Sequence, residues 1–148
     1  MILRRGDGQL FAGSSARFLE QLEEEGSAKI YVKARSVRSN PFYAMLDTGG
    51  AWSMFHVDLA VELGLDQADG TEAPRLETWA GPQSGRLVKC PLTLCADRGP
   101  NLELNATVYY SPDWRGRNII GYQGLLQAVR FAVDPAQNAG LWFFAALD

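Results

Sequence analysis

The run Asp47-Thr48-Gly49-Gly50 places one carboxylate beside a hydroxyl and two glycines. A carboxylate can act as a general base on a water molecule and then as an acid toward a leaving amine. The Thr48 hydroxyl can hydrogen-bond to the backbone and stiffen the loop, and the glycines let main chain approach a second carboxylate or a substrate closely. The run therefore indicates a hydrolytic site. The alternative is a plain turn in which the Asp47 side chain satisfies local backbone amides.

The position of Asp47 favours the hydrolytic site. The apolar run 42–46 leads directly into Asp47, and a second apolar-rich segment, 51–55, follows the glycines. An Asp-Thr-Gly triplet by itself is weak evidence, because it occurs by chance in roughly a few percent of chains of this length. An acidic residue that follows a buried strand and opens a glycine-rich loop is, however, not a usual solvent-facing turn.

The other residues with reactive side chains, Cys90, Cys95 and His56, do not indicate a second site. The cysteines are five residues apart in a predicted strand, so their side chains point to opposite faces and cannot form a local disulfide. His56 is the only histidine, which leaves no plausible set of zinc ligands and no Cys–His nucleophile pair. We therefore expect no metal site and no cofactor.

Short strands are the main elements predicted around Asp47. Residues 28–35 alternate between apolar and polar side chains, as in a half-buried strand, and 42–46 completes a hairpin that leads into Asp47. Further strands are predicted at 91–96, 102–110, 131–133 and 141–144, and short helices at 58–65 and 125–128. Six or more short strands with one or two small helices predict an all-β fold, either a closed barrel or a sandwich.

The N-terminal part is predicted to contain an additional helix. Residues 1–13 show no periodicity and indicate an irregular arm, whereas Ser14 or Ser15 can cap a helix that ends at Gly26. The apolar stripe of this helix would be Phe18, Leu19 and Leu22, with Glu23, Glu24 and Glu25 facing water. We therefore expect an N-terminal arm and amphipathic helix at 1–27, followed by the main domain at 28–148.

A long hairpin is predicted after the helix at 58–65. Its arms are 76–79 and 86–90, and its tip is the Gly- and Pro-containing segment 80–85. Taken alone, this segment predicts an exposed hairpin. The apolar pair Ile119-Ile120 likewise predicts only core packing when it is taken alone. A functional role for either segment is expected only because the Asp47 loop indicates a site.

Length, composition and charge indicate one soluble domain. The 148 residues are 47% apolar and 21% charged, close to globular averages, and suffice for a core that needs no disulfide or metal. The 14 basic residues are scattered among 17 acidic ones, so we expect no nucleic-acid partner. No stretch approaches the roughly 18 apolar residues of a membrane span, and no signal-type apolar run is present, so we expect no membrane partner and a cytoplasmic location.

Three features, in this order, resemble the retropepsin-like aspartic peptidases, including their bacterial single-domain members. They are the loop Asp47-Thr48-Gly49, the hairpin tipped at Ala80-Gly81-Pro82-Gln83, and Ile119-Ile120-Gly121-Tyr122 followed by Leu125-Leu126. The resemblance spans about residues 28 to 144. It implies that the all-β fold is a closed acid-protease barrel.

The resemblance also implies a role for each matching residue. Asp47 would be the catalytic carboxylate, Thr48 would brace two paired loops, and Gly49 would contact the substrate backbone. The mobile flap that closes over the peptide would include Trp79, Ala80, Gly81 and Pro82. Ile120 and Gly121 would support the catalytic loop from beneath.

Two features depart from the family. The fourth residue of the loop is usually Ala, Ser or Thr, whereas this chain has Gly50. The stretch before Lys29 has no counterpart in the minimal family domain. The first departure adds flexibility beside the carboxylate, and the second adds chain at the N-terminal end.

The chemistry of the family requires two carboxylates, whereas this chain has one Asp-Thr-Gly motif. The resemblance therefore implies a homodimer in which a twofold axis pairs one Asp47 from each chain. Two carboxylates about 3 Å apart cannot both ionise, so they share one proton; one activates water while the other protonates the carbonyl oxygen.

The expected function is therefore that of an aspartic endopeptidase acting on an extended polypeptide substrate. The alternative is a catalytically inactive dimerisation or peptide-binding module of the same fold. Retroviral members build much of their dimer from terminal strands, so the run Trp142-Phe143-Phe144 could supply an intersubunit strand, and it could equally be a core strand.

Overall fold

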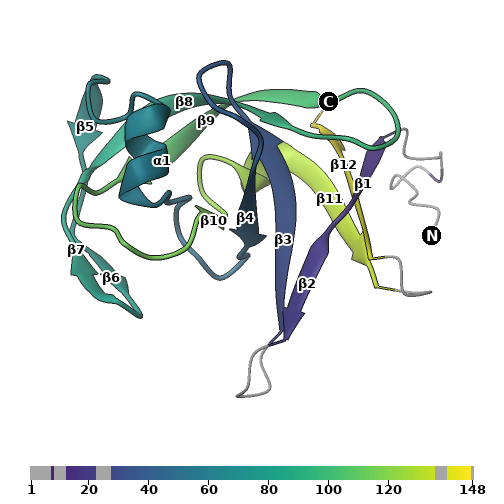
Figure 1. The fold of residues 1–148 in the computed structure, drawn as a ribbon, viewed down its shortest axis with the longest axis horizontal. Helices are drawn as coiled ribbons and strands as arrows, with labels where there is room; N and C mark the ends of the chain where they lie inside the picture. Colours follow the sequence, from purple (N-terminus) through teal and green to yellow (C-terminus); the bar gives the residue numbers. More distant parts are fainter. Residues whose placement is uncertain (1–7, 9–12, 23–27, 136–139, 148) are drawn as a thin grey trace.

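Strands dominate the computed structural model, which describes residues 8, 13–22, 28–135 and 140–147 (Figure 1). The strands of the described residues are β1 (Ser14–Arg17), β2 (Leu19–Leu22), β3 (Ala28–Arg35), β4 (Phe42–Leu46), β5 (Gly70–Glu72), β6 (Leu76–Thr78), β7 (Gly81–Gln83), β8 (Arg86–Leu94), β9 (Leu102–Tyr110), β10 (Ile119–Ile120), β11 (Val129–Asp134) and β12 (Leu141–Ala146). The helices are α1 (Val57–Glu62) and the 3₁₀ helix η1 (Leu126–Ala128). This content confirms the predicted all-β class with two short helices. No helix in the described part of the chain has the length and apolar character needed to cross a membrane.

The largest sheet contains the strand that leads to Asp47. Its strands follow the order β10-β4-β3-β8-β5, with β2 also paired to β3 and β9 to β8. The predicted alternation of β3 is confirmed, because Val32 and Ala34 are buried in the core while Lys33 and Arg35 are exposed. β10 and β5 are the two ends of this strand order, so the closure of a barrel stays a prediction.

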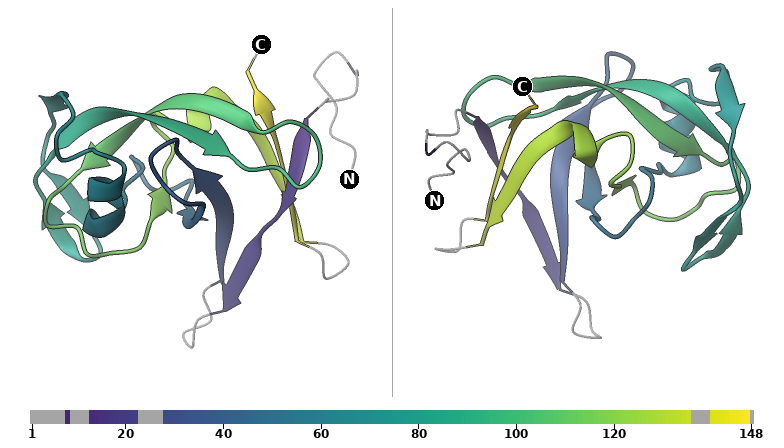
Figure 2. Two further views of the ribbon diagram at one scale, coloured as in Figure 1. Left: turned by 45° about the horizontal axis from the view of Figure 1, so that its top comes forward. Right: turned by 180° about the vertical axis from the view of Figure 1, so that it is seen from behind.

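A second sheet joins the two ends of the described chain in the order β1-β12-β11 (Figure 2). β12 lies in the middle, antiparallel to both neighbours, and its Trp142 and Phe144 are almost fully buried. Because both edges of β12 are already paired, this strand cannot add a strand from another subunit. The C-terminal aromatic run is therefore a core strand, and β1 and β11 are the edges of its sheet.

The predicted N-terminal helix is wrong, because residues 14–22 form β1 and β2 instead. Ser14, Ala16 and Phe18 are buried at every second position, as in a strand, while Leu19 of the predicted apolar stripe is 48% exposed. β1 pairs with β12, and β2 pairs with β3, and such long-range ladders override local helix signals. Residues 23–26 of the predicted helix lie outside the described residues.

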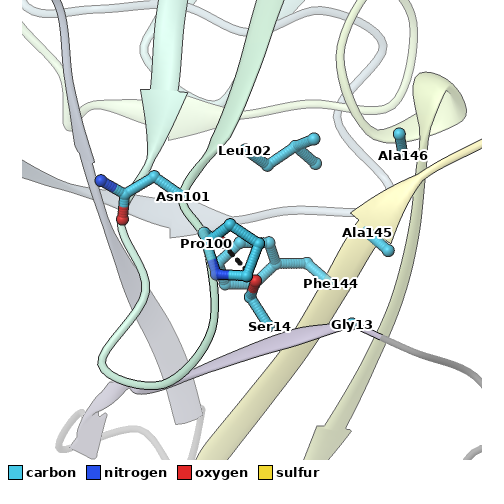
Figure 3. A pocket seen from close by; sticks show the side chains of 8 residues that line it. All are labelled: Gly13, Ser14, Pro100, Asn101, Leu102, Phe144, Ala145 and Ala146. Atoms are coloured by element: carbon cyan, nitrogen blue, oxygen red, sulfur yellow. Dashed lines mark hydrogen bonds between the residues drawn. The ribbon is translucent and has the colours of Figure 1, made fainter.

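The loop between β8 and β9 fixes β1 to the rest of the fold (Figure 3). The Ser15 N–H donates to the Arg98 carbonyl at 2.9 Å, and the Ser14 hydroxyl donates to the Pro100 carbonyl. A hollow of about 330 Å³ beside these contacts is lined mainly by β1, the start of β9 and the end of β12. It shares no lining residue with the hollows at Asp47.

The two cysteines differ in burial, which predicts a difference in reactivity. Cys90 in β8 is 1% exposed, and burial raises its pKa to about 12. Cys95 is half-buried, and burial raises its pKa as well, although Arg35 and Lys33 oppose the rise.

Because the thiolate is the reactive form, iodoacetamide at about pH 8 is expected to label Cys95 slowly and to leave Cys90 unlabelled in the folded protein. Mass spectrometry of the labelled peptides measures this difference, and unfolding in denaturant should make the two thiols equally reactive. Equal labelling rates in the folded protein would contradict the buried position of Cys90.

Candidate active site

The Asp47 side chain is held by the loop that follows β4. The N–H groups of Gly49 and Gly50 donate to Asp47 Oδ1 at 3.0 and 2.9 Å, and the Gly50 N–H lies 3.2 Å from the Asp47 carbonyl oxygen. This is also the geometry that a plain Asp turn predicts, so these bonds alone do not distinguish a site from a turn. They do hold one oxygen of a half-buried carboxylate in a defined position.

Gly50 lies against this carboxylate, while Thr48 and Gly49 are exposed at the tip of the loop. A Cβ atom added at Gly50 would lie 3.1 Å from Asp47 Oδ2, which is closer than an ordinary van der Waals contact. The Ala, Ser or Thr that the family usually has here would therefore press on the carboxylate of this chain. Gly50 removes that contact.

β10 supports the loop from beneath. It runs parallel to β4, with Ile119 opposite Met45 and Ile120 opposite Leu46. The Asp47 N–H continues this ladder by donating to the Ile120 carbonyl at 3.0 Å, and the Ile120 side chain is fully buried. The pairing with β10 therefore fixes the point at which the chain leaves β4 and turns.

Gly121 lies where β10 crosses beneath a second segment of the site. A Cβ atom at Gly121 would overlap the backbone of Trp52, so only glycine fits without a shift of main chain. The Gly121 N–H donates to Ser53 Oγ at 3.0 Å, and Ser53 is fully buried. The sequence did not single out Ser53; a serine inside the apolar run 51–55 was the available signal.

The hairpin near the site is shorter than predicted and is displaced along the chain. β6 pairs with β7, with Thr78 opposite Gly81, so the turn is Trp79-Ala80 and not 80–85. The Thr78 hydroxyl donates to the Gly81 carbonyl at 2.6 Å and accepts the Ala80 N–H at 3.2 Å. Gly81 has a φ of 96°, which favours glycine at the end of this turn. The expected second arm, 86–90, belongs to β8, which continues through 91–94 and pairs with β5 and β9.

The hairpin is fixed at its base and contacts the body of the molecule near its tip. At the base, the Tyr109 hydroxyl lies 3.2 Å from the Pro74 carbonyl oxygen and 3.0 Å from that of Gln83. Burial raises the pKa of Tyr109, which keeps the phenol in its proton-donating form. Near the tip, the ring of Trp79 packs edge-to-face on buried Trp114 with 6.0 Å between centroids, although Trp79 is 76% exposed.

Removing the Tyr109 hydroxyl is expected to loosen the hairpin. In Tyr109→Phe, the Pro74 and Gln83 carbonyl groups lose the one hydroxyl proton that lies within reach of both, which should lower the free energy of unfolding by about 1–2 kcal/mol. Urea denaturation measures this loss, and hydrogen exchange should show faster exchange of amides in 76–83. Tyr122→Phe is the matched control, because Tyr122 is 50% exposed. An equal effect of the two substitutions would contradict the anchoring role of Tyr109.

Two hollows of the described structure meet at Asp47. The first, of about 300 Å³, has walls of Trp52, Met54, Leu76, Trp114 and Ile119 together with the loop glycines. The second, of about 370 Å³, is lined by Lys29, Met45, Asp47, Trp79 and Arg117. Asp47 and Trp79 line both hollows, so the carboxylate lies between them with the hairpin tip beside it. A plain structural turn would not require Asp47 to lie at a cleft, so this position favours a functional site.

The structure brings most of the predicted site residues into one region. Asp47, Gly49, Gly50 and Trp79 line the same hollow, and Ile120 and Gly121 lie directly beneath the loop. The remaining predicted flap residues, Ala80, Gly81 and Pro82, belong to the hairpin but do not line either hollow. The sequence did not indicate Lys29, Tyr109, Trp114 or Arg117, which come from distant strands and loops.

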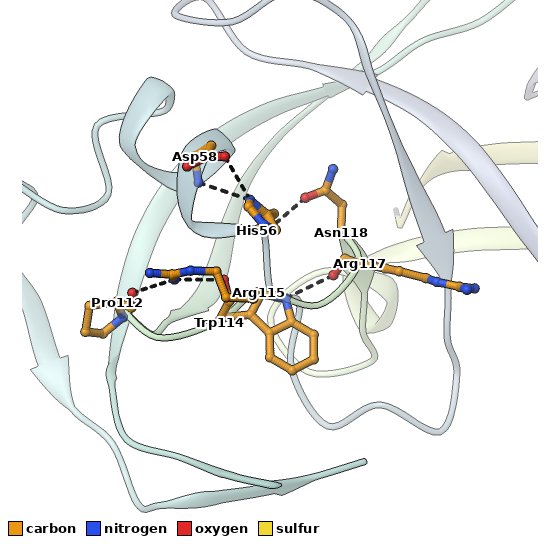
Figure 4. A network of polar contacts seen from close by, with 7 residues as sticks. All are labelled: His56, Asp58, Pro112, Trp114, Arg115, Arg117 and Asn118. Carbon is orange, nitrogen blue, oxygen red and sulfur yellow. Dashed lines mark hydrogen bonds and ion pairs between the residues drawn. The ribbon is translucent and has the colours of Figure 1, made fainter. Parts of the chain in front are cut away.

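His56 belongs to a structural network at the start of α1 (Figure 4). Its ring Nδ1 accepts the Asp58 backbone N–H at 3.3 Å, which caps the helix. The backbone N–H of His56 donates to Asn118 Oδ1 at 2.9 Å. Asn118 Nδ2 in turn donates to the Tyr43 carbonyl at 3.3 Å and so ties α1 to β4. Among the residues that the structure describes, no three His, Cys, Asp or Glu side chains are grouped so that they could hold a metal ion.

Comparisons with known proteins bear on the fold. No protein-family model matches the sequence, and no curated protein sequence matches it. Among solved structures, the chain is similar to a retropepsin-like aspartic protease from Rickettsia conorii, with a TM-score of 0.53 and 17% sequence identity. The match covers 86% of this chain and 98% of that chain. At this identity the similarity establishes the fold and not the activity: the chain has a mostly-β, retropepsin-like fold.

Proposed function

We propose that the chain is one subunit of a homodimeric aspartic endopeptidase that hydrolyses peptide bonds of extended polypeptides. The observation that carries the proposal is the position of the Asp47 carboxylate. It is held by the Gly49 and Gly50 amides at the junction of two hollows, next to the tip of the β6–β7 hairpin. A carboxylate in a cleft with room for substrate on both sides fits hydrolysis better than it fits a structural turn.

Two copies of Asp47 complete the chemistry. Carboxylates brought together at a twofold axis share a proton and titrate as a pair. The ionised one takes a proton from water, which attacks the peptide carbonyl, while the protonated one donates to the carbonyl oxygen. The intermediate then collapses when the leaving amine receives a proton and the carbon–nitrogen bond breaks.

The exposed tip of the Asp47 loop supports the dimer. Thr48 and Gly49 are exposed in the single chain, so the loop is free to meet its symmetry copy. β12 is paired on both edges, so strands that join the subunits would have to use other edges of the fold, such as β1 or β11. In this dimer the hairpin of each chain would close over a peptide that lies across both copies of Asp47.

A catalytically inactive peptide-binding module is the second candidate. Gly50 favours it, because a glycine adds backbone flexibility beside the carboxylate, and a Cβ atom at this position would lie only 3.1 Å from Asp47 Oδ2. The two hollows could then hold a peptide without hydrolysing it. Binding without turnover is the property that separates this candidate from the endopeptidase.

The test is hydrolysis of reduced, alkylated casein by the purified protein between about pH 4 and 7, where a pair that shares a proton is expected to work. A peptide whose scissile amide is replaced by a secondary alcohol mimics the tetrahedral intermediate and should inhibit this cleavage strongly. Sedimentation at the assay concentration should show a dimer. Binding of the alcohol peptide without casein cleavage at any pH would favour the inactive module.

A further inference from the structure

The hollow on one side of Asp47 is basic. Its lining residues are Lys29, Met45, Asp47, Trp79 and Arg117, and we call it the basic hollow. Lys29 is half-buried and Arg117 is exposed, so a charged group can reach both. Two cations therefore lie around one opening that also contains the proposed catalytic carboxylate.

The pleat of the largest sheet places Lys29 in this hollow. Lys29 and Tyr31 are two residues apart in β3, so they lie on the same face, and Met45 of β4 is directly opposite Tyr31. Val32 and Ala44, on the other face, are buried in the core. The face that carries Lys29 is thus the face that borders the site.

Arg117 reaches the same face from the loop before β10. Its Nη1 donates to the Tyr31 hydroxyl at 3.0 Å, and its carbonyl oxygen accepts the Trp114 indole N–H at 3.0 Å. Figure 4 shows the Arg115 side chain extending in the opposite direction, where it donates to the Pro112 carbonyl at 2.9 Å. The hydrogen bond to Tyr31 therefore orients the Arg117 guanidinium beside β3.

The hollow on the other side of Asp47 has a different character. Its walls include Trp52, Met54 and Trp114, and it contains no lysine or arginine among its described lining residues. Apart from Asp47, its charged lining residue is Glu77, whose carboxylate lies 3.8 Å from Arg75 Nε. Charge therefore distinguishes the two sides of the carboxylate within one chain.

We infer that the basic hollow binds a carboxylate of the polypeptide, carried by a Glu or Asp side chain next to the bond at Asp47. This inference rests on the proposed function and adds a substrate preference to it. The planar guanidinium matches a carboxylate in geometry, and Lys29 adds a second positive charge. Met45 and Trp79 supply apolar surface for the methylene groups of a glutamate. In a twofold dimer each subunit contributes one such hollow, so the preference applies on both sides of the scissile bond.

The test uses pools of ten-residue peptides with acetylated and amidated ends. One central position is Glu, Gln or Lys, and the others are randomised over Ala, Leu, Phe and Val. At about pH 6, where glutamate is ionised, bonds next to the central residue should be cleaved about tenfold faster in the Glu pool than in the Gln pool. Raising NaCl from about 0.05 to about 1 M should reduce this ratio, because salt screens the attraction. A second set of the same peptides has free C-termini and tests whether the hollow binds the terminal carboxylate instead of a side chain. If the Glu pool is cleaved no faster than the Gln pool in the amidated set, and peptides with a free C-terminus are cleaved faster than amidated ones, the assignment to a side chain is overturned.

Substitutions in the basic hollow test whether it causes the preference for glutamate. Arg117→Gln should bring the Glu-to-Gln ratio close to one, and Arg117→Glu should turn the preference toward the Lys pool. Tyr31→Phe should lower the ratio in part, because it removes the group that orients Arg117. Arg115→Gln is the matched control and should keep the wild-type ratio, since Arg115 is exposed and does not line the hollow.

Binding to Asp47→Asn separates this inference from the proposed activity. The same pools, labelled with an uncharged fluorophore, are titrated with this variant, with and without Arg117→Gln, and anisotropy reports binding. Tighter binding of the Glu pool that depends on Arg117, without cleavage by the wild type, supports the basic hollow and contradicts the endopeptidase. Cleavage with equal rates for Glu and Gln overturns the inference and leaves the endopeptidase standing. Equal binding without cleavage overturns both.

Discussion

Replacing Asp47 with asparagine is expected to abolish cleavage of unstructured polypeptide while the protein stays folded. The asparagine oxygen can still accept the Gly49 and Gly50 N–H groups, so the loop should keep its shape. An amide, however, can neither take a proton from water nor share one with the second subunit. We expect kcat/KM for a peptide substrate to fall by about 10³-fold, within the range that general acid–base catalysis contributes.

A matched substitution controls for the loss of a negative charge. Asp69 is exposed just before β5 and lines neither hollow, so Asp69→Asn should keep wild-type activity. Denaturation curves of both variants should match that of the wild type within about 1 kcal/mol, because the new asparagine in the loop can keep both of its hydrogen bonds and Asp69 is exposed. Cleavage that persists in Asp47→Asn would contradict the role of this carboxylate. Cleavage by a strictly monomeric protein would contradict the shared pair.

Replacing Gly121 with alanine is expected to have the largest effect on stability. The new Cβ would overlap the backbone of Trp52, and main chain cannot move aside as a flexible side chain can. Overpacking of this kind should lower the free energy of unfolding by about 3 kcal/mol, measured by urea denaturation. It should also lower kcat, because the displaced segment contacts β10, which supports the Asp47 loop.

Gly49→Ala is the control for the Gly121 substitution. Its new Cβ would lie 3.4 Å from Asp47 Oδ1, an ordinary contact, so the change should leave stability within about 1 kcal/mol of the wild type. A Gly121→Ala protein as stable as Gly49→Ala would contradict the close crossing of β10 and the segment at Trp52. Retained activity in Gly121→Ala would contradict the supporting role of this crossing.

The sequence was a good guide wherever the signal was local. Alternation in 28–35 and the apolar run 42–46 predicted β3 and β4, because a strand with one buried face repeats every second residue. The loop chemistry of Asp47, Gly49 and Gly50 was likewise visible, since these residues are adjacent in the chain. The resemblance implied that Ile120 and Gly121 lie beneath the loop, and the structure adds that Gly121 lies against the backbone of Trp52.

The sequence was a poor guide where distant partners decide the conformation. Residues 14–22 have caps and apolar spacing that suit a helix. In the structure they form strands instead, because β1 pairs with β12 and β2 pairs with β3. The hairpin turn was placed too late because Gly81 and Pro82 are usual turn residues. In the structure Gly81 ends the turn with a positive φ, and Pro82 lies in a two-stranded ribbon, where a missing N–H is tolerated.

The sequence alone therefore determined the all-β class and the carboxylate on which the proposed function rests. Both follow from neighbours in the chain: periodicity sets the strands, and Asp47 with its glycines forms a loop from consecutive residues. Tertiary structure decided what surrounds that carboxylate. Lys29, Trp79 and Arg117 are far apart in the sequence, and only strand register and loop packing bring them to one hollow beside Asp47.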